Sequence, residues 1–242
     1  MKINEEPLLT SDNIVYLDNI VYLDNDIQRT FIAKVYTTVW FQLLFTSFFV
    51  GLCKLSQGVS DFLVGEWGMG IMFLFFNLWI CLSVLFLCFT EYLKQYPYNW
   101  IFVITYTLLL SYAIGFISIQ NSTQVILLSG GSTLFLFSGL TLYALQTKID
   151  YTRKGNYLLI SLISLFTLGI LNLFLQLSFF HIIYPLLGAS IFSFYIVYDT
   201  QLLLGSGREM KYTPDDFAIV SISLYLDIVN LFIFILDLVG MR

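Results

Sequence analysis

Charged residues are scarce in this sequence of 242 residues, at 11% of the chain, with 11 lysines and arginines against 16 aspartates and glutamates. Soluble domains carry about 25% charged residues. Hydrophobic residues reach 58%, and the mean hydropathy is +0.83. So few charges cannot cover the surface of a water-soluble fold. The composition excludes a soluble enzyme, a nucleic-acid-binding protein and a disordered chain, and it indicates that the bilayer is the main solvent.

Cysteine and histidine are also rare. The three cysteines, Cys53, Cys81 and Cys88, lie in or beside apolar runs, and an odd number in such places does not make a disulfide framework. Cys81 and Cys88 are seven residues apart, on one face of a helix, and we expect them to be buried small hydrophobic residues. The single histidine, His181, lies at the start of an apolar run, where an interfacial position is expected.

Long apolar runs are abundant. A membrane helix needs about 20 apolar residues. Seven segments qualify, and the loops between them are short, which predicts an all-α, polytopic, seven-helix bundle. The segments are Val35–Cys53, Met69–Phe89, Trp100–Ile119, Val125–Leu145, Tyr157–Leu177, Ile182–Leu203 and Phe217–Val239.

The first 34 residues are polar and acidic and contain no early apolar core, so no cleavable signal peptide is expected. Within them DNIVYL occurs at 12–17 and again at 18–23, a unit too short for a solenoid. We interpret residues 1–34 as a mobile cytosolic tail and residues 35–242 as one transmembrane domain.

Lysine and arginine are distributed unevenly between the two sides of the predicted bundle. The tail and the second, fourth and sixth loops hold nine of them, and the other side holds two, Lys54 and Arg242. By the positive-inside rule the N-terminus is cytosolic, which argues against a G-protein-coupled receptor. The last span contains no lysine, so a retinal Schiff base is excluded. If the last segment re-entered the membrane rather than spanning it, both termini would be cytosolic.

The predicted spans contain only three charged residues, Asp199, Asp227 and Asp237. An aspartate near the middle of the membrane costs roughly 2.5–3.5 kcal/mol on insertion scales, and such residues face the bundle interior or a wet cavity. Asp199 and Asp227 are therefore candidate functional residues. Asp237 lies three residues from the predicted end of its helix, and it either reaches the interface or lines an ion pathway.

Polar residues of the last span form a stripe. At 100° per residue, Asp216, Ser223, Asp227, Asn230 and Asp237 fall within an arc of about 80°. Serine and asparagine would suffice for interhelical hydrogen bonds, whereas the additional carboxylates favour a hydrated path that attracts cations. Asp215 and Asp216, beside its mouth, either concentrate cations or are solvated loop charges.

Asp199 and Asp227 lie on antiparallel neighbouring helices joined by a short loop. Their depths differ by about 7–8 Å at 1.5 Å per residue, a gap that helix tilt can reduce. Two carboxylates that share a low-dielectric site cannot both ionise cheaply. A proton or a cation would stabilise them, which predicts a pH-sensitive pair or a weak calcium site suited to permeation.

Small residues predict close helix contacts in two spans. Gly188 lies in the sixth span, and Gly130, Gly131 and Gly139 lie in the fourth. We expect neighbouring helices to approach at all four positions.

Five sequence segments occur in order along the predicted helices. They are RTFIAKVYTTVWFQLLFT (29–46), YPYNWIFVITYTLLLSYAIG (96–115), LTLYALQTKIDYT (140–152), YIVYDTQLLL (195–204) and LYLDIVNLFIFIL (224–236). No single segment is decisive, but together they resemble the transmembrane Bax-inhibitor-motif family, and most closely its Golgi anti-apoptotic members, including their viral forms.

This resemblance implies a seven-helix bundle with the last helix central. It also implies that Asp199, in the YD motif, and Asp227, in the LYLD motif, form a pH-sensing pair that gates a calcium leak. Some bacterial relatives have an arginine in the second helix that latches this pair. Here Met69–Phe89 has no basic residue, and Asn77 is its most polar member, so a different or weaker latch is expected.

The leading hypothesis is a calcium or cation leak channel in the Golgi membrane or the endoplasmic reticulum that lowers luminal calcium and inhibits apoptosis. Calcium would be the permeant ion, no cofactor is needed, and the expected partners are membrane lipids and either apoptosis regulators or calcium channels, with no nucleic acid. A non-conducting adaptor is the alternative. An intramembrane aspartyl protease is disfavoured, because such enzymes have a Gly-x-Gly-Asp signature where this chain has Leu224-Tyr225-Leu226-Asp227. The protein is therefore expected not to be an enzyme.

Overall fold

The computed structural model describes most of the chain. The described ranges are 9–11, 14–17, 20–23, 25–88, 90–175, 179–205 and 212–241. Seven of the described helices are long and apolar enough to cross a membrane, as the sequence predicts.

Three short antiparallel strands precede the first helix: β1 (Leu9–Ser11), β2 (Ile14–Leu17) and β3 (Ile20–Leu23). The two copies of the DNIVYL repeat supply β2 and β3, so each repeat pairs with the other, with Ile14 opposite Leu23 and Leu17 opposite Ile20. The sequence analysis did not anticipate this pairing.

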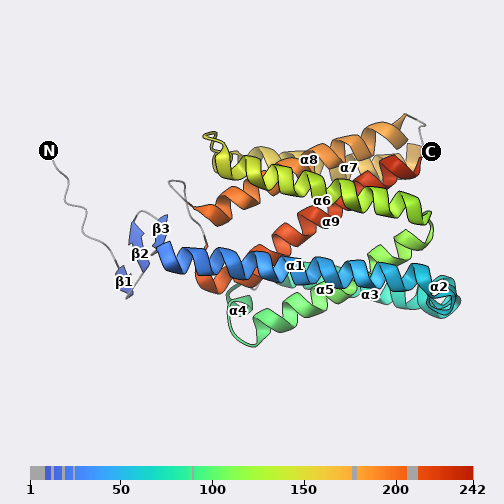
Figure 1. Ribbon diagram of the computed structural model, residues 1–242, viewed down its shortest axis with the longest axis horizontal. Helices are drawn as coiled ribbons and strands as arrows, with labels where there is room; N and C mark the ends of the chain where they lie inside the picture. The colour runs from blue at the N-terminus through green and yellow to red at the C-terminus, as the bar shows by residue number, and fades with distance from the viewer. Residues whose placement is uncertain are drawn as a thin grey trace.

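The seven long helices alternate in direction between two ends of the bundle (Figure 1). We call the end at which the first helix begins the N-terminal end, and the end at which the last helix finishes the C-terminal end. The spanning helices are α1 (Asn25–Leu55), α3 (Glu66–Cys88), α5 (Tyr98–Ile119), α6 (Thr123–Gln146), α7 (Gly155–Leu175), α8 (Phe180–Leu204) and α9 (Phe217–Gly240). Short helices lie in the connections: α2 (Gln57–Val64), α4 (Thr90–Leu93) and the 3-10 turns η1 (Thr152–Lys154) and η2 (Pro214–Asp216).

Two helix boundaries bear on the predictions. Helix α1 begins at Asn25, ten residues before the predicted start at Val35, so the predicted tail contributes its last ten residues to a helix. Helix α9 has 24 residues without a break, about 36 Å at 1.5 Å per residue, and crosses the bundle diagonally from one end to the other (Figure 1). The last segment therefore spans the bundle and does not re-enter it.

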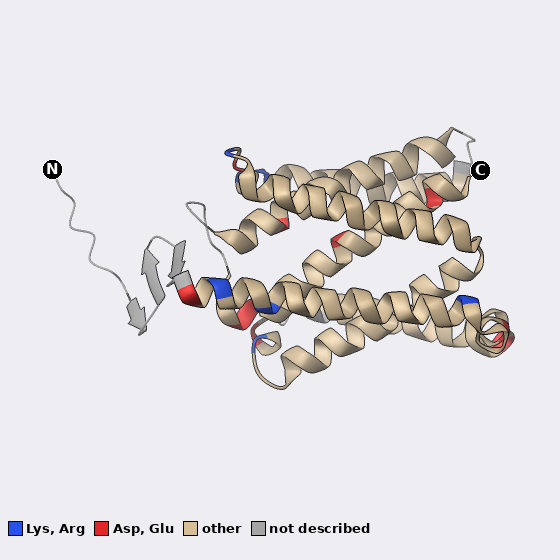
Figure 2. Ribbon diagram, in the orientation of Figure 1, with Lys and Arg blue, Asp and Glu red and all other residues tan. Residues whose placement is uncertain are grey.

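Helix α9 is the centre of the bundle, as expected. It packs against α8, α6, α1 and α5, and its buried residues occupy every turn from Phe217 to Leu236. Helices α3 and α7 lie at the periphery, where only 6% of each apolar window is buried within the protein. Charged residues gather near the two ends of the bundle, and few lie along its length (Figure 2).

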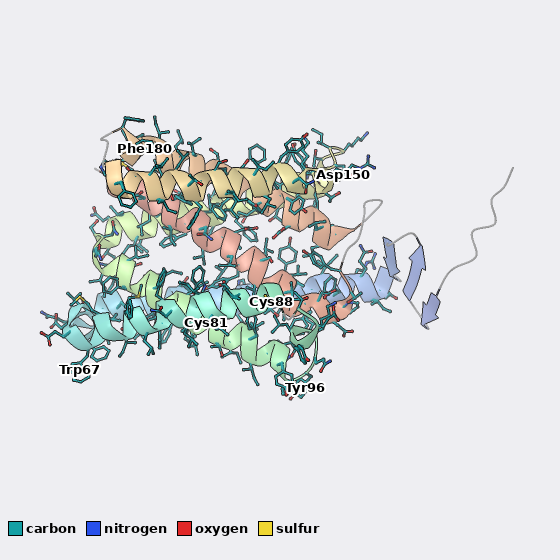
Figure 3. The ribbon with its side chains drawn as sticks, turned by 180° about the vertical axis from the view of Figure 1, so that it is seen from behind. Trp67, Cys81, Cys88, Tyr96, Asp150 and Phe180 are labelled. Carbon is teal, nitrogen blue, oxygen red and sulfur yellow. The ribbon has the colours of Figure 1, made fainter. Side chains whose placement is uncertain are left out.

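Two sequence expectations are wrong, for one physical reason. Cys81 and Cys88 are exposed on peripheral α3 (Figure 3), and only Cys53 is buried. A Cβ added at Gly130, Gly131 or Gly139 would meet nothing within 4 Å, so these glycines mark no close approach. Because the solvent here is hydrocarbon, apolar and small residues are also placed on the outside of the bundle.

The prediction for Gly188 is confirmed. A Cβ on this glycine would lie 2.5 Å from the Phe234 ring of α9. That ring is held between Phe192 and Tyr184, with centroid separations of 5.8 and 5.7 Å. The close approach of α8 to α9 therefore needs a glycine at this position.

Candidate functional site

Asp199 of α8 and Asp227 of α9 come together, and their carboxyl groups lie in hydrogen-bonding contact. The packing of α9 on α8 brings the two side chains together despite the difference in depth that the sequence predicts. Two ionised carboxylates offer only acceptors, so this contact is a hydrogen bond only when the pair holds a proton. Asp227 is 5% exposed, and its Oδ2 has no hydrogen-bond partner among the described residues.

Tyrosines surround the pair. Tyr195 and Tyr198 of α8 lie close enough for the charge of Asp199 to act on their phenols. Tyr212 enters from the loop before η2, outside the spans. Burial raises the pKa of the Tyr212 phenol above its ordinary value, and the nearby charge of Asp199 adds to the shift. The aspartates thus lie in an interior of aromatic rings and phenol hydroxyls rather than in open water.

Asp216, at the mouth of α9, has a structural role. Its Oδ2 accepts hydrogen bonds from the backbone N–H and the hydroxyl of Thr213, at 2.8 and 2.9 Å. Its Oδ1 lies 3.5 Å from the Nζ of Lys94, which also pairs with Glu91 at 2.8 Å. Asp216 is 5% exposed, so it ties the start of α9 to the segment after α4 and is not a solvated loop charge.

The other predicted pathway residues do not join the pair. Asp215 lies near Lys34 of α1, within range of its charge. Asn230 donates its amide N–H to the Leu226 carbonyl on its own helix, at 2.8 Å. Asp237 is exposed near the C-terminal end of the bundle, within electrostatic range of His181.

No basic latch reaches the aspartates among the residues that the structure describes. Asn77 is exposed on α3, and its amide donates to the Phe73 carbonyl one turn back, at 2.7 Å. Helix α3 packs mainly on α5, α2 and α4 rather than on α8 or α9. Among the described residues, the two carboxyl groups contact each other, and neither is in a salt bridge with a basic side chain.

A second polar cluster lies on the opposite face of α9, because Tyr225 and Asp227 are two residues and about 200° apart. The Thr46 hydroxyl contacts the Ser111 hydroxyl at 2.9 Å and the Tyr225 hydroxyl at 2.8 Å. One turn away on α1, the Gln42 amide donates to the Thr107 hydroxyl at 2.9 Å. We call these five buried residues of α1, α5 and α9 the hydroxyl seam.

Sequence reasoning missed the hydroxyl seam. Its signal was present, since Gln42 and Thr46, and Thr107 and Ser111, are polar pairs four residues apart in otherwise apolar spans. Sequence reasoning also missed Gln201, which is fully buried on α8. Its amide accepts from the Tyr151 N–H and donates to the Ile149 carbonyl, which holds the loop after α6 against α8.

Chemically, the pair can bind one proton or, when both carboxylates are ionised, a cation. Calcium prefers six to eight oxygen ligands. The described residues contain no group of three or more histidine, cysteine, aspartate or glutamate side chains suited to a metal. The two carboxylates fit brief cation binding better than storage.

Comparison with known proteins gives consistent results over most of the chain. A family model described as "Inhibitor of apoptosis-promoting Bax1" matches residues 28–242. The chain is 35% identical over 218 residues to "Bax inhibitor 1" of Schizosaccharomyces pombe, which covers 89% of this chain and 77% of that protein. It is 27% identical over 220 residues to "Protein lifeguard 3" of Homo sapiens, which covers 89% of this chain and 70% of that protein.

Proposed function

Because the chain belongs to the family of inhibitors of apoptosis-promoting Bax1, which are anti-apoptotic multi-pass membrane proteins, we propose that it acts as a pH-sensitive cation leak channel. The leak lowers the calcium content of an internal compartment, the Golgi or the endoplasmic reticulum, and so weakens death signalling. The contact between the carboxyl groups of Asp199 and Asp227, with one oxygen of Asp227 unpartnered, carries the proposal.

The number of protons on the pair controls the leak. With one proton the two carboxyls hold α8 against α9. Loss of that proton puts two charges in contact, which repel by roughly 4 kcal/mol at about 4 Å and an effective dielectric constant of about 20. A second proton removes the negative charge that attracts a cation. The leak rate therefore depends on pH through this pair.

The environment of Asp227 supports a channel over an intramembrane protease. Leu224, which lies three residues before Asp227 and on the same side of α9, is 1% exposed and packs in the core. A protease must admit a substrate backbone beside its aspartates, and this side chain fills space on that side of the helix. We propose on this ground that the protein is not an enzyme.

Calcium flux into proteoliposomes tests the channel. Asp227→Asn should slow the flux at least tenfold at neutral pH and remove its dependence on pH between roughly pH 6 and 8. Asp237→Asn is the matched control, because this aspartate lies on the same helix outside the pair, and it should leave both properties unchanged.

Wild-type flux and an unchanged pH profile in Asp227→Asn would refute the assignment. If wild-type protein carries no flux, while an Asp199→Asn, Asp227→Asn double variant still protects cells from apoptosis, the non-conducting adaptor is correct.

A further inference from the structure

A groove between α1 and α5, distant from the carboxyl pair, has the properties of a lipid-binding site. Its volume is about 780 Å³, within the roughly 300–1,000 Å³ of ordinary ligand sites. Apolar side chains of both helices line it along its length, including Phe41, Phe45, Ile104 and Leu108. A groove with this apolar lining can accommodate an acyl chain.

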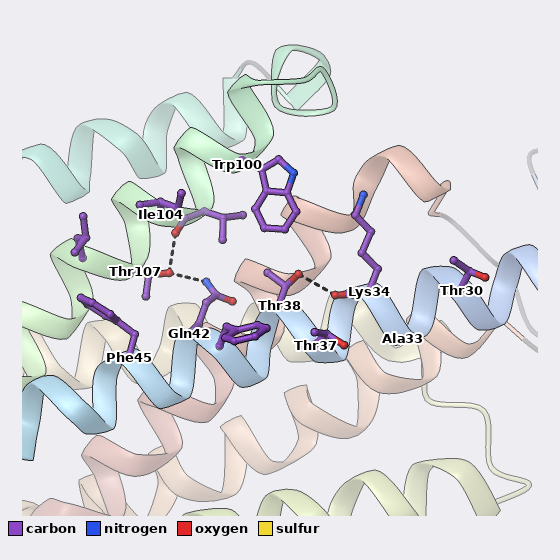
Figure 4. A pocket seen from close by; sticks show the side chains of 13 residues that line it. Thr30, Ala33, Lys34, Thr37, Thr38, Gln42, Phe45, Trp100, Ile104 and Thr107 are labelled. Atoms are coloured by element: carbon purple, nitrogen blue, oxygen red, sulfur yellow. Dashed lines mark hydrogen bonds between the residues drawn. The ribbon is translucent and has the colours of Figure 1, made fainter.

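A cation lies at the mouth of the groove. The Nζ of Lys34 is 3.4 Å from the centroid of the Phe217 ring, and the Trp100 ring packs on the same phenylalanine at 5.1 Å. Figure 4 shows the indole nitrogen of Trp100 on the side of its ring that faces Lys34. Within the described residues, no acidic group lies within 4 Å of this ammonium. An ammonium and an indole N–H at one rim suit a phosphate group.

Deeper in the groove lies an unsatisfied acceptor. Gln42 is 3% exposed and lines the groove, and its Oε1 has no hydrogen-bond partner in the part of the chain that the structure describes. The orientation of the amide is fixed by its neighbour, because the Thr107 hydroxyl donates to the Val103 carbonyl and so must accept from the Gln42 N–H (Figure 4). A buried acceptor without a donor costs about 1–3 kcal/mol. A ligand hydroxyl or amide N–H would satisfy it.

We propose that this groove binds a phosphate-headed lipid that carries a hydrogen-bond donor below its phosphate, with the phosphate on Lys34 and the donor on Gln42. The two residues are eight apart on α1, a rise of about 12 Å, and rotation of the flexible lysine stem away from the Phe217 ring would bring its ammonium closer to the amide. Lysophosphatidate, with a free hydroxyl, and ceramide phosphate, with a hydroxyl and an amide N–H, share this chemistry.

Native mass spectrometry of the detergent-purified full chain measures the binding. The probes are lysophosphatidate, ceramide phosphate and a monoalkyl phosphate of equal chain length that lacks the hydroxyl. Wild-type protein should bind lysophosphatidate or ceramide phosphate at least about fivefold more tightly than the monoalkyl phosphate. Which of the two lipids binds more tightly identifies the lipid class that supplies the hydrogen-bond donor. Equal affinity for all three probes would refute the role of Gln42 without the use of any variant.

Variants test the charged end of the site, at Lys34. Lys34→Gln should weaken lysophosphatidate binding about tenfold, whereas Lys148→Gln, at an exposed loop lysine, should not change it. Asp215→Asn should strengthen binding, because the charge of Asp215 acts on Lys34. Equal losses in Lys34→Gln and Lys148→Gln would show attraction to overall charge only. None of these results depends on calcium flux, so the lipid-binding proposal and the channel proposal can be refuted independently.

Discussion

Two polar clusters lie on opposite faces of α9 and differ in how they are satisfied. At the centre of the hydroxyl seam, the Thr46 hydroxyl contacts the hydroxyls of Ser111 and Tyr225 at 2.9 and 2.8 Å, and all three groups are neutral. In the carboxyl pair, Asp199 and Asp227 lie in contact, and Oδ2 of Asp227 has no hydrogen-bond partner among the described residues. Satisfied neutral hydroxyls fix a position, whereas two acids in contact form a group whose charge changes. One face of α9 is therefore suited to fixing its position against α1 and α5, and the other face is suited to responding to pH.

The largest effect on stability is expected from a change in packing at the α8–α9 interface. Gly188→Leu should lower the free energy of unfolding by about 3 kcal/mol, because its Cβ would meet the Phe234 ring at 2.5 Å and that ring is enclosed by other aromatics. Denaturation in mixed micelles measures this. Gly139→Leu is the matched control, at a glycine with open space around it, and should cost little. Equal losses at both positions would mean that the interface does not depend on this contact.

The next test removes the centre of the hydroxyl seam. Thr46→Val should lower the free energy of unfolding by about 1–2 kcal/mol, because Ser111 and Tyr225 lose their shared partner inside the bundle. The same measurement on Thr167→Val gives the background, since that hydroxyl is exposed and bonds only to its own helix. A Thr46 variant as stable as the Thr167 variant would remove the distinction between the two faces of α9.

The carboxyl pair should matter less for stability than the hydroxyl seam. Asp227→Asn should change the free energy of unfolding by less than about 1 kcal/mol, because asparagine can still hydrogen-bond to Asp199 without needing a shared proton. If Asp227→Asn lowered the free energy of unfolding as much as Thr46→Val, the main role of the pair would be to stabilise the fold. Unfolding measured alongside the flux assay separates the two effects.

The smallest effect is expected at the ion pairs of Lys94, outside the spans. The hydrogen bond that Lys94 donates to Glu91, with Asp216 nearby, raises the pKa of Lys94 above its ordinary value of 10.5. The stabilisation is therefore complete at neutral pH and is lost as the pH rises through the raised value. Lys94→Gln should cost about 0.5 kcal/mol at pH 7 and nothing at strongly alkaline pH. A cost that persists there would show that the lysine acts through packing of its stem.

Much of the fold follows from the sequence, because a bilayer restricts the choices. Every backbone polar group in hydrocarbon needs an internal partner, so each long apolar run becomes a helix, and all seven predicted spans form. Burial was harder to predict. Gly188 is packed while Gly139 is open, and Cys53 is buried while Cys81 is exposed. Lipid and protein interiors are equally apolar, so composition does not separate an inward face from an outward one.

The candidate site divides in the same way. Asp199 and Asp227 could be selected from the sequence alone, because a charged side chain in the hydrocarbon region is energetically costly and is usually retained for a function. The three-dimensional packing was needed to show that α8 and α9 bring these two carboxyls together, that Asp216 pairs with Lys94 and that Asp237 stays apart. Neutral polar side chains such as Gln42 and Thr46 cost little free energy in the membrane, so the sequence does not mark them. Their role depends on the hydrogen-bond partners that the packed helices place beside them.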